Sequence, residues 1–286
     1  MGPFEDRCAV HATSHKDSSD FFCRDRAPAP LIALPKQPYS LITMSSPQVS
    51  VLIPAYNEEA FIARVIESVT QSFSAMPDRS YEIIVCDNNS TDRTAEIAAM
   101  NGAKVVAESH NQISRARNTA AKAAQGNWFI FLDADTFLNP ELLGRTLNCL
   151  ASGDVVGGGA TVAFDKVIHN PFAFLLTHVW TAISVVFRLA AGSYIFCTRD
   201  AWTGTGGFDE QFYAGEELFF SRKLKKWGRR RAQRFTIIAG APVVTSARKL
   251  EWFSQWQLLS RMVVLALPGA LKRRDRCGLW YSRPAG

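Results

Sequence analysis

Short apolar segments alternate with amphipathic helical segments along residues 49–135. The apolar segments 49–53, 81–86, 103–106 and 128–132 have the length and the β-branched or aromatic content of buried strands. Between the first two of these segments, apolar residues recur at helical spacing, at positions 61, 62, 65, 66, 69 and 73. This β-α-β-α-β-α-β rhythm predicts an α/β fold with a mostly parallel central sheet flanked by helices.

Polar and acidic residues follow three of the predicted strands. Asn57 and Glu58 follow the first strand, Asp87 ends the second, and Asp133 and Asp135 follow the fourth. In open α/β sheets the ligand binds outside the carboxyl ends of parallel strands. We therefore expect these side chains to share one site. Asn57 is also expected to cap the helix that follows it.

The sequence Asp133-Ala134-Asp135 ends the fourth predicted strand. Two carboxylates at the mouth of a buried strand repel each other, and burying them is costly unless a cation lies between them and a ligand. Mg²⁺ commonly shares carboxylates with substrate phosphates. A metal-bound phosphate is one interpretation. The alternative is that both residues only open the next loop and cap a helix near Pro140.

No glycine-rich phosphate loop follows the first predicted strand. That strand runs into Pro-Ala-Tyr-Asn-Glu-Glu, and neither a GxGxxG nor a Walker A sequence occurs. A dinucleotide fold of the glycine-rich type is therefore excluded. The charge of a bound diphosphate would need another neutralising group, and a metal held by Asp-x-Asp supplies one.

Four segments carry a resemblance to a known family: Val-Ser-Val-Leu-Ile-Pro-Ala-Tyr-Asn-Glu-Glu (49–59), Ile-Val-Cys-Asp-Asn-Asn-Ser-Thr-Asp (84–92), Ala-Arg-Asn (116–118) and Asp-Ala-Asp (133–135). In this order and spacing they resemble the nucleotide-binding half of family 2 glycosyltransferases, which have the GT-A fold. The resemblance implies a nucleoside-diphosphate-sugar donor, a divalent metal (Mn²⁺ or Mg²⁺) and inversion at the anomeric carbon by direct displacement.

The resemblance also implies roles for individual residues. Asp135 is the implied metal ligand. The residues implied to hold the nucleotide sugar are Ala55, Tyr56, Glu58, Asp87, Asp133 and Ala134. Asn88 stands where many relatives carry a second Asp. Arg115 and Arg117 lie on a predicted Ala-rich helix over 114–125; an exposed helix face is expected for at least one of them, and reach to the nucleotide is the alternative.

A second acidic pair, Glu216 and Glu217, opens a helix predicted to run to Trp227. The segments Gly-Gly-Phe-Asp-Glu (206–210) and Gly-Glu-Glu (215–217) resemble family segments whose second acid is the general base, which implies this role for Glu217. Here Glu replaces the usual Asp, so Glu216 remains an alternative base. The base takes a proton from the acceptor hydroxyl. The competing interpretation is that two acids only favour a helix N-terminus.

The segment Thr-Ser-Ala-Arg-Lys (245–249) resembles a family segment that follows the last strand. Arg248 would then pair with the leaving diphosphate, where a cation stabilises developing charge. A surface cation without such a role is the alternative.

Composition suggests one large domain with appendages. Residues 1–46 lack periodicity and are predicted to be a disordered N-terminal extension, with a translation start at Met44 as a hypothesis. Residues 47–250 are predicted to form the GT-A domain, with a nucleotide-binding half (47–138) and an acceptor half (139–250). Residues 251–286 are predicted to be an amphipathic, basic tail. The six cysteines show no CxxC pair, which favours reduced thiols in the cytoplasm.

Positive charge is concentrated in the C-terminal part of the chain. The net charge is +6, but from Arg222 onward there are 16 Lys or Arg and 2 acidic residues. This favours peripheral contact with an anionic membrane, on its inner face, over nucleic acid, for which no motif is present. Phe172–Phe187 contains no acid, Lys or Arg. Its ~24 Å as a helix is short of a ~30 Å hydrocarbon core, so a surface-lying helix and a buried helix both remain open.

Together these observations predict a hexosyltransferase-like enzyme of the cell envelope that moves a sugar to a hydroxyl acceptor, such as a lipid or a glycan. Two alternatives remain open. A sugar nucleotidyltransferase also uses an acidic metal site, but usually carries a Gly-rich basic segment that is absent here. A catalytically silent membrane-associated scaffold of the same fold is supported only by the Glu at position 217.

Overall fold

The computed structural model describes residues 46–166, 186–248 and 269–277. The chain divides into two units, residues 1–43 and residues 44–286, and every described residue belongs to the second unit. All but the last residue of the predicted N-terminal extension (1–46) and nearly all of the apolar segment 172–187 lie outside the described residues. Most of the predicted tail, 251–286, does so as well.

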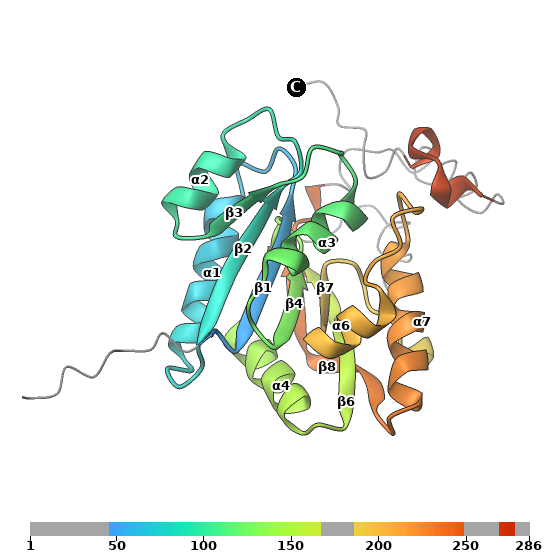
Figure 1. Ribbon diagram of the computed structural model, residues 1–286. Coiled ribbons are helices and arrows are strands. Elements are labelled where there is room, and N and C mark those ends of the chain that lie inside the picture. The colour runs from blue at the N-terminus through green and yellow to red at the C-terminus, as the bar shows by residue number, and fades with distance from the viewer. Residues whose placement is uncertain (1–45, 167–185, 249–268, 278–286) are drawn as a thin grey trace, which may run out of the picture. The chain divides into compact units, whose positions relative to one another are not determined.

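A central sheet organises the described residues, with the strand order β3-β2-β1-β4-β7-β6-β8-β5. The strands of its first half, and the helices that connect them, are the alternating elements that the sequence predicts (Figure 1). These are β1 (Val49–Ala55), α1 (Ile62–Ser74), β2 (Tyr81–Asp87), α2 (Thr94–Met100), β3 (Lys104–Ala107), α3 (Ile113–Ala123) and β4 (Trp128–Leu132). All strand pairs within this half are parallel.

The second half of the sheet is mixed. The strands and helices of this part of the chain are β5 (Thr136–Phe137), α4 (Pro140–Ala151), β6 (Val155–Phe164), β7 (Tyr194–Thr198), α6 (Arg199–Thr205), α7 (Glu216–Arg229) and β8 (Arg234–Thr245). Strand β7 runs antiparallel to both β4 and β6, and β5 runs antiparallel to β8, whereas β6 and β8 are parallel. Two short 3₁₀ helices follow, η1 (Ala270–Lys272) and η2 (Arg274–Arg276).

Local differences from the sequence expectations are small. Strand β8 is one long strand, because Gly240 (φ 82°) carries the backbone through its middle. The two-residue strand β5 and the short helix α6 were not expected. A register shift between β6 and β8 at Ala160 and Val162 precedes the end of both strands.

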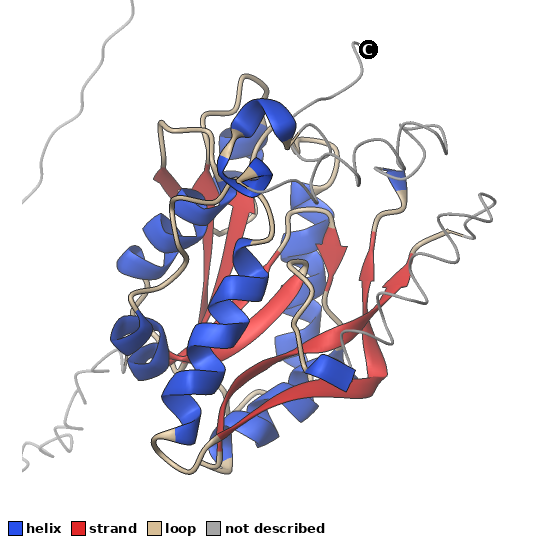
Figure 2. Cartoon of the chain, turned by 90° about the vertical axis from the view of Figure 1, so that its right-hand side faces the viewer, coloured by secondary structure: helices blue, strands red, loops and turns tan. Residues whose placement is uncertain are grey.

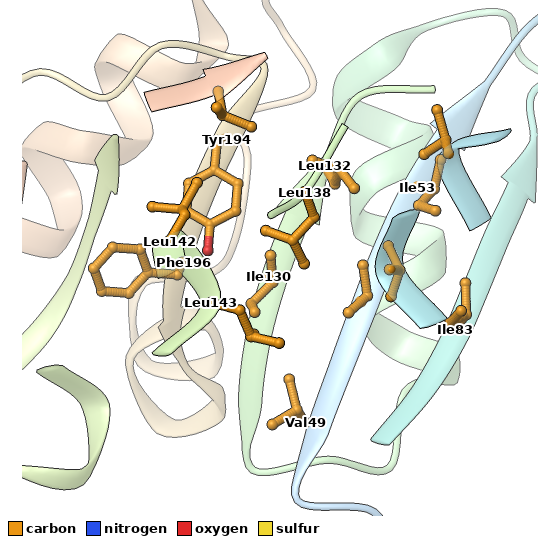
Figure 3. Packing of buried hydrophobic residues seen from close by; sticks show 14 of the residues in the cluster. Val49, Ile53, Ile83, Ile130, Leu132, Leu138, Leu142, Leu143, Tyr194 and Phe196 are labelled. Carbon is orange, nitrogen blue, oxygen red and sulfur yellow. The ribbon is translucent and has the colours of Figure 1, made fainter. Parts of the chain in front are cut away.

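The core lies on both faces of the sheet, because residues in a strand alternate between faces. In β1, Val51 and Ile53 join one hydrophobic cluster with α1 and α4, whereas Leu52 joins another with α3, α6 and α7. Figure 3 shows the first cluster, in which Leu142 and Leu143 of α4 lie near Ile130 of β4. Helices on both faces leave the ends of the strands as the place for a site.

No helix within residues 46–166, 186–248 and 269–277 has both the length and the apolar content that crossing a bilayer would need.

Candidate functional site

The carboxyl ends of β1, β2 and β4 bring the first set of predicted site residues to one edge of the sheet (Figure 1). Ala55 at the end of β1 is in register with Asp87 at the end of β2. Strand β4 pairs with the other side of β1 and leads directly into Asp133. The convergence expected from the sequence is therefore present for the residues that follow all three strands.

The loop after β1 is tied to the loop after β2 by hydrogen bonds. Asn57 has φ 50°, its backbone N–H donates to Ser90 Oγ (3.0 Å), and its side-chain Oδ1 accepts from Thr91 N (2.7 Å). The Glu58 N–H donates to Thr94 Oγ1 (2.7 Å). Asn57 is thus not the helix cap that the sequence suggested, since α1 begins at Ile62, and it joins two loops instead.

Asp87 presents a carboxylate oxygen to this edge. Its Oδ1 atom is buried and has no hydrogen-bond partner among the described residues. Buried acceptors are usually satisfied, so this oxygen is suited to an N–H or O–H of a bound molecule. The neighbouring Asn88 is fully engaged: its Nδ2 donates to the carbonyls of Glu108 (3.1 Å) and His110 (2.7 Å), and its Oδ1 accepts from Gln112 N (2.9 Å). A second Asp could not make those two donations.

Asp135 and Glu58 share a single arginine partner from the other half of the sheet. Arg248 Nη2 pairs with Glu58 Oε2 and lies 3.4 Å from Asp135 Oδ2, and its guanidinium lies 4.3 Å from the centre of the Phe61 ring. Both carboxylates are nearly inaccessible, with Asp135 3% and Glu58 6% exposed. Arg248 is therefore a partner of the predicted metal ligand and not an isolated surface cation.

This pair of carboxylates fits a divalent metal that is shared with a substrate. Among the described residues, no group of three or more His, Cys, Asp or Glu is arranged to hold a metal. Mg²⁺ usually binds through one or two carboxylates plus substrate phosphates, which matches Asp135 beside Glu58. The guanidinium of Arg248 already shows that positive charge is favoured at this point.

Asp133 pairs with a different arginine, Arg117 of α3, which the sequence analysis left without a definite role. Arg117 Nη2 donates to Asp133 Oδ1 (2.9 Å) and to the Gly192 carbonyl (2.7 Å), and Nη1 donates to Glu216 Oε1 (2.6 Å). The side chain is 1% exposed. Arg115, by contrast, is only half-buried, with 41% of its side chain exposed, and pairs with Glu210 at 3.3 Å. The two arginines therefore differ, and Arg115 is the more exposed of the two.

The acidic pair at the start of α7 lies beside this arginine. Glu216 is 3% exposed and Glu217 is half-buried. A methyl group on Gly192 would lie 3.4 Å from Arg117 Nη2 and 3.6 Å from Glu217 Cδ, so Glu217 and Arg117 flank the same glycine. The structure thus joins the first acid of Asp133-Ala134-Asp135 to the Glu216-Glu217 pair through one buried guanidinium.

Burial and mutual repulsion alter the protonation of this pair. Desolvation, followed by the charge of Glu217, raises the pKa of Glu216 from 4.5 to about 8, while Arg117 opposes the rise. Desolvation also raises the pKa of Glu217, against the attraction of Arg117. Two adjacent carboxylates, one buried and one half-buried, beside one shared cation favour a single proton between them. Such a pair can both accept and hold a proton.

The segment around η1 forms hydrogen bonds with the residues that precede α7. The Tyr213 N–H donates to the Leu271 carbonyl (2.8 Å), and Lys272 Nζ donates to Gln211 Oε1 (2.9 Å). Burial, with a further contribution from the charge of Glu216, raises the pKa of Cys277 to about 11. This basic C-terminal segment therefore borders the acidic pair.

The remaining predicted residues have simple positions. Ala55 and Ala134 are 2% and 5% exposed and belong to the hydrophobic cluster, so only their backbone is available to a ligand. Tyr56 is half-buried in the loop after β1. Arg117 is the residue whose importance sequence reasoning missed. The sequence feature that indicates its burial is its position on the apolar face of α3, among Ala116, Ala120 and Ala121.

Comparison with known proteins gives consistent matches. Residues 50–196 match the model of glycosyl transferase family 2. Glycosyltransferase AglE of Haloferax volcanii is 34% identical over 198 residues, covering 65% of this chain and 64% of its own length. The low-salt glycan biosynthesis hexosyltransferase Agl6 of the same organism is 38% identical over 168 residues, covering 55% and 40%. This chain thus spans less than two thirds of the length of these relatives.

Two solved structures share the fold. A mannosyltransferase from Pyrobaculum calidifontis, in complex with GDP-Man and Mn²⁺, has a TM-score of 0.57 at 19% identity, covering 76% of this chain and 60% of its own. Glucosyl-3-phosphoglycerate synthase from Mycobacterium tuberculosis, with Mn²⁺, UDP and phosphoglyceric acid, has a TM-score of 0.52 at 21% identity, covering 81% and 79%. The expected fold class is confirmed.

Proposed function

The chain belongs to glycosyl transferase family 2, and from this premise we propose that it transfers a sugar from a nucleoside-diphosphate sugar to a hydroxyl acceptor with inversion. The observation that carries the proposal is the bridge from Asp133 through Arg117 to Glu216, with Glu217 beside it. It sets the predicted donor edge and a proton-accepting pair next to each other. Relatives whose names or complexes include sugar transfer, GDP-Man or UDP support the donor class.

Each residue has a defined task in this proposal. The unsatisfied Asp87 Oδ1 accepts a hydrogen bond from the nucleoside, and Tyr56 borders it. Asp133 contacts the donor sugar. A divalent metal held by Asp135, with Glu58 nearby, would supply positive charge to the diphosphate. Arg248, already beside both acids, pairs with the departing diphosphate.

The reaction is a single displacement. The acceptor oxygen attacks the anomeric carbon as the bond from that carbon to the diphosphate oxygen breaks, and the nucleoside diphosphate leaves. Glu217 takes the hydroxyl proton. Glu217 is favoured over Glu216 because it is half-buried, whereas Glu216 is 3% exposed and is held by Arg117 at 2.6 Å. Glu216 then holds Arg117 in position and influences the protonation of Glu217.

The proposal also includes location and acceptor class. A lipid-linked acceptor and a cytoplasmic enzyme at the inner face of an anionic membrane are proposed from the positive charge of the C-terminal part of the chain. The basic segment Lys272–Arg276 lies next to the acidic pair, where an anionic acceptor would approach.

A donor panel tests the function. The purified chain is incubated with UDP-, GDP- and dTDP-sugars and Mn²⁺ or Mg²⁺, and products are separated by chromatography. Release of nucleoside diphosphate supports sugar transfer. Formation or consumption of pyrophosphate would support the sugar nucleotidyltransferase instead. No product with any donor would support the catalytically silent scaffold.

Two variants separate donor binding from proton transfer. Asp135→Ala should abolish metal-dependent donor binding. Glu217→Gln should bind donor normally and lose transfer by about 10²- to 10⁴-fold, the usual effect of removing a general base. Donor binding is measured by calorimetry and transfer by product formation. Full sugar transfer by Glu217→Gln would show that another residue is the general base. Glu216→Gln would then be the next variant to measure.

A further inference from the structure

One face of α7, away from the acidic pair, carries a group of clustered cations. Arg222, Lys225 and Arg229 are spaced three and four residues apart and so share one face of the helix. Arg188 lies close to them, because Lys225 Nζ donates to the carbonyl of the preceding residue, Phe187. Desolvation, followed by the charges of Arg229, Arg188 and Arg222, lowers the pKa of Lys225. These four residues are called the α7 cation cluster. Figure 2 shows the molecule from the side on which α7 lies in Figure 1.

Within the part of the chain that the structure describes, no carboxylate pairs with the α7 cation cluster. Lys225 Nζ donates to the Phe187 carbonyl and lies 5.6 Å from the centre of the Phe235 ring. None of the four cations forms an ion pair with a carboxylate of the described residues, whereas Arg93, Arg145 and Arg234 elsewhere on the surface each have one. Such crowding of like charges is relieved by an anionic partner.

Exposed apolar side chains adjoin the cluster in the chain. Val186 and Phe187 are 72% and 63% exposed and directly precede Arg188. In the sequence they end the segment 172–187, which contains no Asp, Glu, Lys or Arg. A soluble polyanion or a free phosphate would leave these apolar groups in water. A lipid surface takes up both kinds of group, because cations meet the headgroups and apolar side chains enter the acyl boundary.

We propose that the α7 cation cluster, with Val186 and Phe187, is a docking surface for an anionic phospholipid bilayer. Helix α7 begins at Glu216 and Glu217, and at ~1.5 Å per residue Arg222 and Arg229 lie about 8 and 18 Å along it from Glu217. Docking through this helix holds the acidic pair within about 20 Å of the headgroups. The inference rests on the membrane contact proposed above, and it places the main part of that contact on α7 and not on the C-terminal segment Lys272–Arg276.

The experiment measures vesicle binding without donor or acceptor, so its failure is distinct from a failure of sugar transfer. The full chain is sedimented with vesicles of phosphatidylcholine alone and of phosphatidylcholine containing one third phosphatidylglycerol. The triple variant R188Q/R222Q/R229Q should lose about 100-fold in partitioning to the anionic vesicles, at roughly fivefold for each cation. The wild-type chain should bind these vesicles less tightly as salt rises.

Two further variants complete the test. K272Q/R273Q/R274Q removes the same charge from the C-terminal segment and should bind at least tenfold more tightly than the α7 variant. R188K/R222K/R229K keeps the charge and should bind like the wild type, which separates lost charge from lost folding. Equal losses in the two glutamine variants, or no loss in the α7 variant, would overturn the proposal. So would binding of the wild-type chain to an RNA oligomer and not to vesicles.

Discussion

At the scale of single residues, Arg117 contributes most to the arrangement of the candidate site. It is buried on α3 and contacts Asp133, Glu216 and the Gly192 carbonyl. Its guanidinium also lies 5.2 Å from the centre of the Phe208 ring. Burying one cation between two carboxylates is acceptable because their attraction offsets its desolvation. Removing the cation leaves buried negative charges uncompensated.

Substitution of Arg117 should therefore affect stability as well as activity. We expect Arg117→Met to lower the free energy of unfolding by about 3–5 kcal/mol, the usual effect of breaking a buried ion pair. Urea denaturation measures this change. Arg115→Met is the matched control on the same helix, because its ion pair is partly exposed and should contribute less than about 1 kcal/mol. Equal losses in the two variants would contradict the structural role assigned to Arg117.

The pH dependence of stability should report on Glu216. Its pKa in the folded chain is raised from 4.5 to about 8 by burial and by Glu217, so the folded state holds a proton that the unfolded state has released. The stability from this proton is fully present below pH 4.5 and is lost as pH rises through about 8. Unfolding free energies of the chain free of ligand, measured between pH 5 and 8.5, should fall.

The variant Glu216→Gln isolates this contribution. Glutamine cannot titrate, so the variant should lose less stability than the wild type over the same pH range. A fall of equal size in both proteins would assign the pH dependence to other groups. Glu82→Gln is a suitable control for a carboxylate outside the site, where Glu82 accepts hydrogen bonds from Ser50 and Gln125.

At the scale of elements, β6 shows how two neighbouring strands can leave no room for a side chain. It pairs with β7 on one side and β8 on the other through Gly157, Gly158 and Gly159. A Cβ at Gly158 would collide with the Thr236 carbonyl oxygen and the ring of Phe196. These glycines are therefore required by packing and not by a positive φ, since none of them has one.

Substitution at Gly158 should consequently destabilise the sheet. We expect Gly158→Ala to lower the free energy of unfolding by about 1–3 kcal/mol or more, the usual effect of overpacking. Gly144→Ala is the control, because its Cβ would meet only the flexible end of Met76 at 3.1 Å, and alanine favours a helix by about 0.5–1 kcal/mol. Thermal melting would compare the two. A Gly158→Ala protein as stable as the wild type would show that β7 or β8 can move.

At the scale of the whole molecule, the proposed donor site joins the two halves of the sheet. Asp87 ends β2 and Asp135 lies in the loop that follows β4, whereas Arg248 follows β8. A ligand that contacts both halves stabilises the folded chain by mass action, by about 2.7 kcal/mol at a concentration 100-fold above its dissociation constant.

Nucleoside diphosphate with Mn²⁺ should therefore raise the melting temperature. For a domain of this size the increase should be about 5–10 °C at that concentration. Calorimetric scans with UDP, GDP and dTDP, each with Mn²⁺ and with chelator, would identify the base. Asp135→Ala should lose the Mn²⁺-dependent part of the increase, while Glu217→Gln should keep it. An undiminished increase in Asp135→Ala would contradict its assignment as metal ligand.

Local sequence patterns specify the alternating elements of the first half and the three polar strand ends. Both are local properties: side-chain period selects strand or helix, and parallel strands bring their carboxyl ends to one edge. The resemblance that rests on 49–59, 84–92 and 133–135 was likewise carried by short segments. The mixed second half was harder to foresee, because β7 and β8 take their partners from remote parts of the chain.

Which charges meet at Asp133-Ala134-Asp135 depends on contacts between distant parts of the chain. Asp133 pairs with Arg117 and Asp135 with Arg248, so the two acids that opened the question are not equivalent. Arg248 is 190 residues from its other partner, Glu58, in the sequence. Local propensity contains no information about such contacts, since they arise when α3, α7 and the end of β8 pack around one strand edge and bury charges that must then be paired.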